Sequence, residues 1–362
     1  MSSLATAPTT AREDRLAGRL ADALAAIDAP DVVLAVTRHG RRTLATGGTA
    51  LAPAVSPAER PAVPRDALRY ELGSISKTYS VLLLAALARS GALSLDDPLT
   101  AHLPGGLPLR HPASRRITLR HLATHTAGLP RIPRDLVPGA VMHPNANGYA
   151  GYGTERLLRA FARTRPRHRP GTRWHYSNFG LALLACAMSG ATGADYAELL
   201  ADHVLSPLGL TDTTLNQSGD TRTNATGHRR NGSTPVPGIE GGAFTAAAGV
   251  RSTPGDALSY LEAHLAPEAT PLRHALRDVQ VPQLRRGLRR RETHTLTWYQ
   301  HPAPGGPLLF HAGATFGQKA FLGFHPATGT ALAAFATRRG EFRRLLGTAY
   351  ELLYALAADP AH

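Results

Sequence analysis

The sequence is poor in cysteine and has no long apolar run. Its single cysteine, Cys186, lies in LALLACAM, so no internal disulfide can form, and we interpret this thiol as a small core residue. The longest apolar runs, VLLLAALA and LALLACAM, are far shorter than the ~20 residues that span a bilayer. The N-terminal stretch lacks the apolar region of a signal peptide. We therefore expect a soluble, cytoplasmic protein without a membrane partner.

Lysine is almost absent, although the chain is strongly basic. Of the 40 basic residues only Lys77 and Lys319 are lysines, so arginine is the default cation. Arginine stays protonated in proteins, whereas burial or a nearby charge can neutralise lysine. We therefore interpret Lys77, in ELGSISKTYS, as a candidate proton acceptor, and Lys319 as an exposed strand residue.

The net charge of +14 permits several kinds of acidic partner. Two arginine clusters contribute to it, RTRPRHRP at 163–170 and RRGLRRRE at 285–292. Neither lies in a nucleic-acid-binding signature, and aromatic residues make up only 6% of the chain, so we expect no nucleic-acid partner. We interpret the clusters as solvated surface; the alternative is binding of an anionic substrate or an acidic carrier protein.

Apolar periodicity predicts regular structure at both ends of the chain. At the start, a helix over 11–28 precedes two strands, VVLAVTR and RRTLATGG, that form a hairpin. At the end, the strands PLLFHAGA, QKAFLGFHP and TALAAFATR, with a turn at 326–329, precede an amphipathic helix over 341–358.

The middle of the chain reads as helices and loops. The predicted segments are a Pro-rich loop over 52–65, an apolar helix from Ser74 to about Ser90, helices and loops over 90–220, and a loop over 215–240. The economical arrangement is an α+β fold, with an antiparallel sheet covered by the two terminal helices. We expect residues 1–78 and 225–362 to form this sheet domain and residues 79–224 an inserted, mainly helical domain.

Ser74 and Lys77 are three residues apart at the predicted start of a helix, so they share one face. The helix N-terminus favours developing negative charge, and burial behind the apolar run SVLLLAALA drives Lys77 towards its neutral form. An adjacent proton acceptor and a positive field are what a serine nucleophile requires. The motif is short enough to arise by chance, so it needs support from elsewhere.

Two further stretches carry suitable chemistry. In RWHYSNFG, Tyr176 beside a cation can serve as a phenolate base for Ser74, and Asn178 can hold Lys77 and a substrate carbonyl. In FHAGATFGQ, His311 lines a cleft and Gly313 permits close approach of a ligand. The backbone N–H groups of Ala314 and Ser74 can together form an oxyanion hole.

The order Ser-x-x-Lys, Tyr-x-Asn, His-x-Gly resembles the penicillin-recognising serine enzymes, namely class C β-lactamases, D-Ala-D-Ala carboxypeptidases and family VIII esterases. Other segments resemble the family in the same order, over roughly residues 30–355: GALSLDDPLTAHLP, ITLRHLATHTAGLP, YAELLADHVLSPLGLTDT and AAAGVRSTPGDALSYL. The resemblance implies a mixed α/β sandwich with an all-helical domain and an active site between them.

The resemblance also implies roles for the motif residues. Ser74 is then the nucleophile and Lys77 its partner, Tyr176 the general base and leaving-group acid, and Asn178 a substrate contact. His311 and Gly313 match the third motif, on the edge strand of the sheet. In β-lactamases of this type that motif begins with lysine, which anchors the substrate carboxylate; His311 holds a carboxylate less well, so we expect poor β-lactam hydrolysis. Arg338 or Arg339 is a candidate for the missing cation.

We therefore expect a serine hydrolase that forms an acyl-enzyme on Ser74 and cleaves a small ester or amide, without metal or cofactor. The first alternative is an acyltransferase, transpeptidase or peptide cyclase that uses the same acyl-enzyme on a small-molecule, peptide or carrier-bound acyl substrate. The second is a non-catalytic binding protein on the same scaffold.

Overall fold

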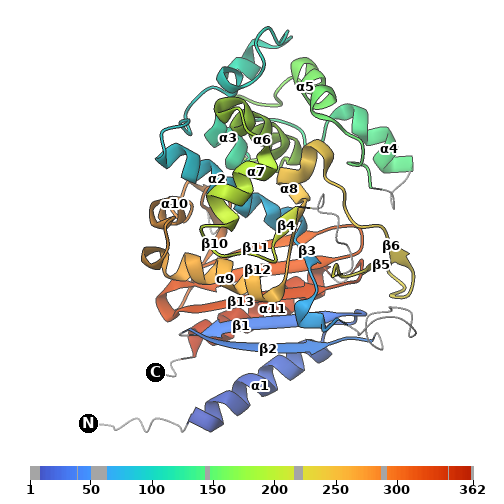
Figure 1. The fold of residues 1–362 in the computed structure, drawn as a ribbon, viewed down its shortest axis with the longest axis vertical. Helices are drawn as coiled ribbons and strands as arrows, with labels where there is room; N and C mark the ends of the chain where they lie inside the picture. Colours follow the sequence, from blue (N-terminus) through green and yellow to red (C-terminus); the bar gives the residue numbers. More distant parts are fainter. Residues whose placement is uncertain are drawn as a thin grey trace.

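The computed structural model describes residues 9–38, 40–49, 63–142, 147–215, 223–286, 292–340 and 342–359. Its largest element is an eight-stranded antiparallel sheet in the order β2-β1-β13-β12-β11-β10-β9-β8 (Figure 1). The strands are β1 Val32–Arg38, β2 Arg41–Gly47, β8 Leu284–Arg286, β9 Glu292–His294, β10 Tyr299–Ala303, β11 Gly306–Ala314, β12 Lys319–His325 and β13 Thr330–Ala336.

The central strands are apolar on both faces because both faces are covered. Alternate residues of β1 point to opposite sides: Val32, Leu34 and Val36 pack in one apolar cluster, and Val33 and Ala35 in another. The first cluster is closed by the terminal helices α1 Thr9–Ala25 and α11 Phe342–Ala358, and the second by α9 Pro254–Leu265 and the helical layer (Figure 1).

The helical layer comes from the chain between the two groups of sheet strands. Its helices are α2 Ser76–Arg89, α3 Leu119–Ala123, α4 Val137–Met142, α5 Thr154–Arg163, α6 Asn178–Thr192, α7 Tyr196–Leu200, α8 Thr245–Ala248 and α10 Arg273–Asp278. Both α2 and α6 are buried along most of their length, which explains their uniformly apolar sequences. Lys77 lies on α2 and Asn178 on α6, while Ser74 and Tyr176 lie just before the starts of these helices.

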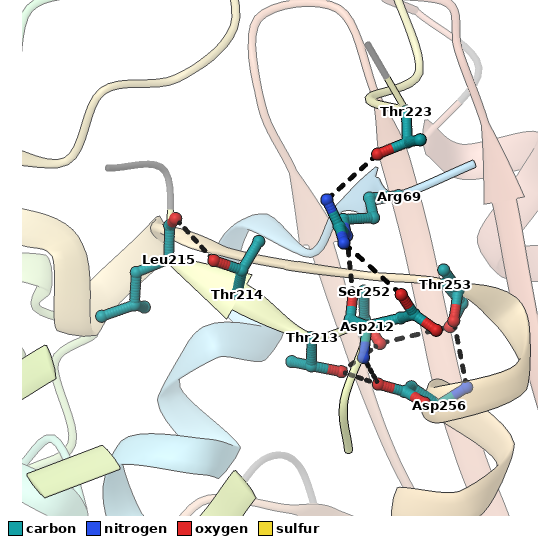
Figure 2. Close-up of polar contacts among 9 residues, drawn as sticks. All are labelled: Arg69, Asp212, Thr213, Thr214, Leu215, Thr223, Ser252, Thr253 and Asp256. Carbon is teal, nitrogen blue, oxygen red and sulfur yellow. Dashed lines mark hydrogen bonds and ion pairs between the residues drawn. The ribbon is translucent and has the colours of Figure 1, made fainter. Parts of the chain in front are cut away.

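A small sheet, β3-β7-β4, connects the large sheet to the helical layer. It consists of β3 Tyr70–Glu71, β7 Val250–Ser252 and β4 Thr214–Leu215, and a further pair is formed by β5 Gly227–His228 and β6 Pro235–Val236. Figure 2 shows how polar side chains fasten it: Arg69 donates to the Asp212 carbonyl (3.0 Å) and to Thr223 Oγ1 (3.0 Å). Asp256 in the first turn of α9 accepts from Asp212 N at 2.8 Å. The segment that leads into Ser74 is thereby fixed.

The structure confirms the antiparallel sheet with terminal helices and the hairpin of β1 and β2. The first helix ends at Ala25, three residues earlier than expected, and the turn at Pro326–Thr328 is present. Strands β8, β9 and β10 were not predicted, and the loop over 215–240 contains two short strands. Most of the Pro-rich segment lies outside the described residues. The division into domains at residues 78 and 225 stays a prediction.

Candidate active site

Ser74 lies in a tight turn, Gly73–Ile75, immediately before α2. Gly73 has φ +51°, and a Cβ there would lie 2.8 Å from the nitrogen of Ala314. A Cβ on Gly313 would lie 1.8 Å from the Leu72 carbonyl oxygen and 3.2 Å from the Ser74 nitrogen. The two glycines therefore allow the turn and strand β11 to approach until the amides of Ser74 and Ala314 are neighbours. Gly313 serves this backbone packing, where we expected it to admit a ligand.

Tyr176 is in direct contact with Ser74: its hydroxyl donates to Ser74 Oγ at 2.6 Å. Tyr176 precedes α6, and the next residue, Ser177, is the N-cap, whose Oγ accepts from Gly180 N at 2.9 Å and donates to the Pro130 carbonyl at 2.7 Å. On the other side, the His125 ring lies 4.6 Å from the Tyr176 ring. These contacts hold the phenol against the serine.

Lys77 is fully enclosed beneath the serine. Its Nζ donates to the Ala247 carbonyl of α8 at 2.7 Å and lies 5.0 Å from the centroid of the Tyr176 ring. Burial lowers the pKa of Lys77 well below its usual value, and the positive charge of Arg131 lowers it further. Within the described chain Lys77 has no hydrogen bond to Ser74 or Tyr176. Lys77 thus places an amine near Ser74, and its burial favours the neutral form of that amine.

The expected phenolate is not supported. Burial raises the pKa of Tyr176 above its usual value, and this effect outweighs the opposing effects of the hydrogen bond with Ser74 and of the charge of Arg131. Burial favours the neutral form of Lys77, which reduces the positive charge available to stabilise a phenolate. The two pKa directions therefore favour a protonated phenol beside an amine that gives up its proton more easily than an ordinary lysine.

Asn178 reaches the site but does not hold Lys77, contrary to expectation. Its Nδ2 donates to the hydroxyl of Tyr149 at 2.7 Å, and its buried Oδ1 has no hydrogen-bond partner in the described chain. Tyr149 was missed because it lies in NGYAGYG, a stretch with no motif of its own. The unpaired oxygen is available to a substrate N–H group.

His311, Gly313 and Ala314 lie at the end of β11, which is not the edge strand we expected, because β10 follows it in the sheet. The pairing with β10 begins only at Phe310, however, so residues 311–314 pair with β12 alone. His311 is buried, its Nδ1 lies 3.1 Å from the Ala312 carbonyl oxygen, and burial lowers its pKa to about 3. The imidazole is therefore neutral and offers no cation to a substrate.

A buried polar network behind β11 was not predicted. The Glu71 carboxylate pairs with Arg251 at 2.8 Å, accepts from Ile239 N at 2.6 Å and accepts from Thr315 Oγ1. Glu71 precedes Ser74 by three residues and Thr315 follows Ala314, so one carboxylate fastens both sides of the proposed oxyanion hole. In the sequence the one sign of this network is Glu71, the acidic residue in ELGS. The residues that Glu71 binds are distant from it in the sequence, so the network could not be predicted.

Lys319 is also part of this region, and its prediction as an exposed residue is wrong. It is buried, and its Nζ donates to the carbonyls of Thr315 (2.9 Å) and Gln318 (3.1 Å), closing the turn after β11. Burial lowers its pKa to about 8. The prediction failed because the alternation of residues in a strand does not reveal that the carbonyls of the preceding turn will bind the Lys319 ammonium group.

Ser74 opens into a cavity of about 330 Å³. The lining includes Ala314 and Asn178, the apolar residues Ile132, Leu136, Ile239 and Phe316, and two arginines, Arg131 and Arg339. Of the two candidates for a cation, Arg339 reaches this cavity, whereas Arg338 pairs with Asp28 and donates to the Arg230 carbonyl at 2.7 Å.

Other expectations concern residues away from this cavity. The arginines at 163, 165, 167 and 169 are exposed, while most of the second cluster lies outside the described residues. Cys186 is half-buried. Among the described residues no group of His, Cys, Asp or Glu is arranged to hold a metal ion, and no described helix is long and apolar enough to cross a bilayer.

The chain is similar to known proteins along most of its length. The Beta-lactamase family model matches residues 16–356. The D-alanyl-D-alanine-carboxypeptidase/endopeptidase AmpH of Escherichia coli (strain K12) is 30% identical over 194 residues, which are 54% of this chain and 48% of that protein. The chain thus spans about half the length of this curated relative.

Solved structures share the fold along almost the whole chain. A class C beta lactamase from Rhodobacter sphaeroides superposes with a TM-score of 0.77 at 24% identity, covering 95% of this chain and 99% of its own. A Beta-Lactamase/D-Alanine Carboxypeptidase from Pseudomonas syringae gives 0.80 at 22% identity, covering 97% and 100%. The protein has the β-lactamase/transpeptidase-like fold and belongs to the beta-lactamase family, whose members are serine hydrolases.

Proposed function

We propose that this protein hydrolyses a small ester or amide through an acyl-enzyme on Ser74. The observation that carries the proposal is the contact of 2.6 Å between Tyr176 and Ser74, next to a buried lysine with a lowered pKa. A serine hydroxyl becomes nucleophilic when a neighbouring base removes its proton. Here burial lowers the pKa of Lys77 and so favours the unprotonated form of that base.

The proton handling follows from the two pKa directions. As Ser74 Oγ attacks the substrate carbonyl, its proton passes to the Tyr176–Lys77 pair, where the neutral amine of Lys77 is the final acceptor. The phenol then gives its proton to the leaving group and takes back the proton held by Lys77; its raised pKa favours this return, and its hydroxyl lies beside the reacting oxygen. Water resolves the acyl-enzyme by the reverse sequence.

The oxyanion of the tetrahedral intermediate is stabilised by the backbone N–H groups of Ser74 and Ala314. Their proximity is supported by the close packing of Gly73 against Ala314 and of Gly313 against Leu72 and Ser74. Such preorganised donors contribute about 3 to 4 kcal/mol each to transition-state stabilisation. Glu71 and Lys319 act as positioning residues, because they hold the turn that follows Ala314.

The substrate is an ester or amide other than a β-lactam. Relatives include enzymes named as a carboxypeptidase/endopeptidase and as class C beta lactamases. The third motif of this chain, however, presents a buried neutral imidazole at His311 where β-lactamases of this type present an ammonium. We therefore expect slow turnover of penicillins and cephalosporins.

Acyl transfer is the second candidate, and one observation favours it. Arg163, Arg165, Arg167 and Arg169 are all exposed in a single stretch, which suits docking of an acidic carrier. Product analysis distinguishes the two functions: with an added amine, an aminolysis product in excess over the free acid indicates transfer. Carrier binding through these arginines would weaken as salt is raised.

The test of the proposed function is turnover of short-chain 4-nitrophenyl esters by the wild type and by Ser74→Ala. We expect the variant to lose at least about 10³-fold in kcat, since nucleophile and base act as one unit. Equal ester hydrolysis by both proteins would overturn the proposal. If no ester is hydrolysed, intact-mass spectrometry after incubation with a fluorophosphonate distinguishes two cases. An adduct shows that the nucleophile is active and that the test ester is not a substrate, whereas no adduct shows an inactive enzyme.

A further inference from the structure

His125 lies in the loop that follows α3, and this loop runs beside the segment that carries Tyr176. The two pieces of chain are hydrogen-bonded to each other before the site is reached, because Gly171 N donates to the Thr126 carbonyl at 2.9 Å. His125 itself is buried. The loop thus supports the Tyr176 segment from within the helical layer.

Three contacts join His125 to Tyr176 and to its neighbours in the chain. The His125 carbonyl accepts from His175 N at 2.8 Å, and its Nδ1 accepts from Ser177 N at 3.2 Å. Its ring lies 4.6 Å from the Tyr176 ring. One residue therefore binds the backbone on both sides of the phenol and packs against the phenol itself.

The backbone conformation of His125 is unusual. Among the described residues other than glycine, His125 alone has a positive φ, which is +58°. This left-handed conformation is unfavourable for residues with a Cβ, and it persists only where surrounding contacts enforce it. Here the conformation accompanies hydrogen bonds from the carbonyl and from Nδ1 to the same segment.

The hydrogen bond from Ser177 requires a neutral imidazole. Because the Ser177 N–H donates to Nδ1, that nitrogen carries no proton, and the ring proton is on Nε2. Burial lowers the pKa of His125 well below its usual value, and a positive charge on Lys77 lowers it further. The ring is therefore a hydrogen-bond acceptor at neutral pH.

A buried histidine can also serve the core alone, and His264 is such a case. It is buried against the rings of Tyr260 and Phe324, and neither of its ring nitrogens has a partner in the described chain. His125 differs because both its ring and its carbonyl bind the segment of Tyr176.

We propose that His125 is a positioning residue, which holds the Tyr176 hydroxyl at Ser74 Oγ by binding the residues on both sides of the phenol. The hydroxyl lies 2.6 Å from Ser74 Oγ, and a misplacement of about 1 Å costs roughly 100-fold in rate. This inference rests on the proposed function, because it concerns proton transfer at the same serine.

Two substitutions separate the hydrogen bond from the backbone conformation. Glycine and asparagine both tolerate a positive φ, but only asparagine carries an acceptor on Cγ, where histidine carries Nδ1. We expect His125→Gly to lower kcat for a 4-nitrophenyl ester by about 10- to 100-fold with little change in KM, and His125→Asn to keep most of kcat. His264→Leu is the matched control, which should lose stability and keep kcat.

A double-mutant cycle shows whether His125 acts through Tyr176. Once Tyr176→Phe has removed the hydroxyl, its position no longer matters, so His125→Gly should lower kcat much less in that background than in the wild type. Rates are normalised to the folded fraction. If His125→Gly does not fold, His125→Gln replaces it, because its oxygen lies one bond further out and should not rescue kcat.

The failures are distinguishable. Equal fold-losses in the two backgrounds, an undiminished kcat in His125→Gly, or a loss in His125→Asn as large as in His125→Gly overturns the inference while Ser74-dependent turnover remains. Hydrolysis that persists in Ser74→Ala overturns the proposed function instead. A loss in His125→Gly that asparagine rescues and Tyr176→Phe suppresses supports the inference.

Discussion

Replacing Gly313 by alanine would separate strand β11 from the turn that carries Ser74. The new Cβ would lie 1.8 Å from the Leu72 carbonyl oxygen, and real Cβ contacts essentially never fall below 3.0 Å. The two backbones must therefore move apart by about 1.2 Å. Misplacing a catalytic group by about 1 Å costs roughly 100-fold in rate, and losing an oxyanion-hole donor costs about 10²- to 10³-fold.

We expect Gly313→Ala to lower kcat of ester hydrolysis by about 10²- to 10³-fold. Rates should be normalised to the folded fraction, measured by circular dichroism. Gly323→Ala is the control, because its Cβ would meet side chains of Leu353 (2.7 Å) and Phe321 (2.9 Å) in the core. That variant should lose stability but keep kcat. If folded Gly313→Ala retained the wild-type kcat, the proposed oxyanion hole would be wrong.

Three further predictions concern the Tyr176 phenol, the buried network of Glu71 and the second lysine, Lys319. Tyr176→Phe removes the hydrogen bond of 2.6 Å to Ser74, and kcat should fall by about 10²- to 10⁴-fold. Glu71→Gln leaves the buried Arg251 without its counter-ion, and urea unfolding should show a loss of about 3 to 5 kcal/mol. Lys319 has a folded pKa of about 8, below 10.5 when unfolded, so between these values the unfolded state binds more protons and stability rises with pH. Lys319→Met should lack this rise, a difference of about 3 kcal/mol.

Matched variants separate these effects from general damage. Tyr350→Phe removes a tyrosine hydroxyl that lies 3.0 Å from His301 Nδ1, on the face of the sheet covered by α11, and should keep its activity. Glu262→Gln breaks the Arg42–Glu262 surface pair and should cost less than about 1 kcal/mol. Equal stability losses in Glu71→Gln and Glu262→Gln would contradict the buried network, and equal pH slopes for wild type and Lys319→Met would contradict the burial of that lysine.

The parts of the fold that sequence predicted are those governed by local pattern. Strands β1, β12 and β13 are continuous apolar runs because helices cover both of their faces. Strand β10 reads YQHPA, with no such signal, and exists because it pairs with β11. Pairing between distant segments leaves no trace in a single short stretch.

The same distinction applies to the site. The spacing of Ser74 and Lys77 places both at the head of one helix, and the order of the three motifs indicated Tyr176 as the partner. The phenol's protonation state was not predictable, because it depends on how much of the fold encloses the ring. Glu71 and His125 escaped notice since their contacts with the site form only on folding.

The central claim is that Ser74 is acylated with the help of Tyr176 and Lys77. Its most direct test is intact-mass spectrometry of enzyme quenched during turnover of a slow ester, followed by peptide mapping. The account predicts one acyl adduct on the peptide containing Ser74 in the wild type, and none in Ser74→Ala or Lys77→Met. An adduct on any other residue, or an undiminished adduct at Ser74 in Lys77→Met, would contradict it.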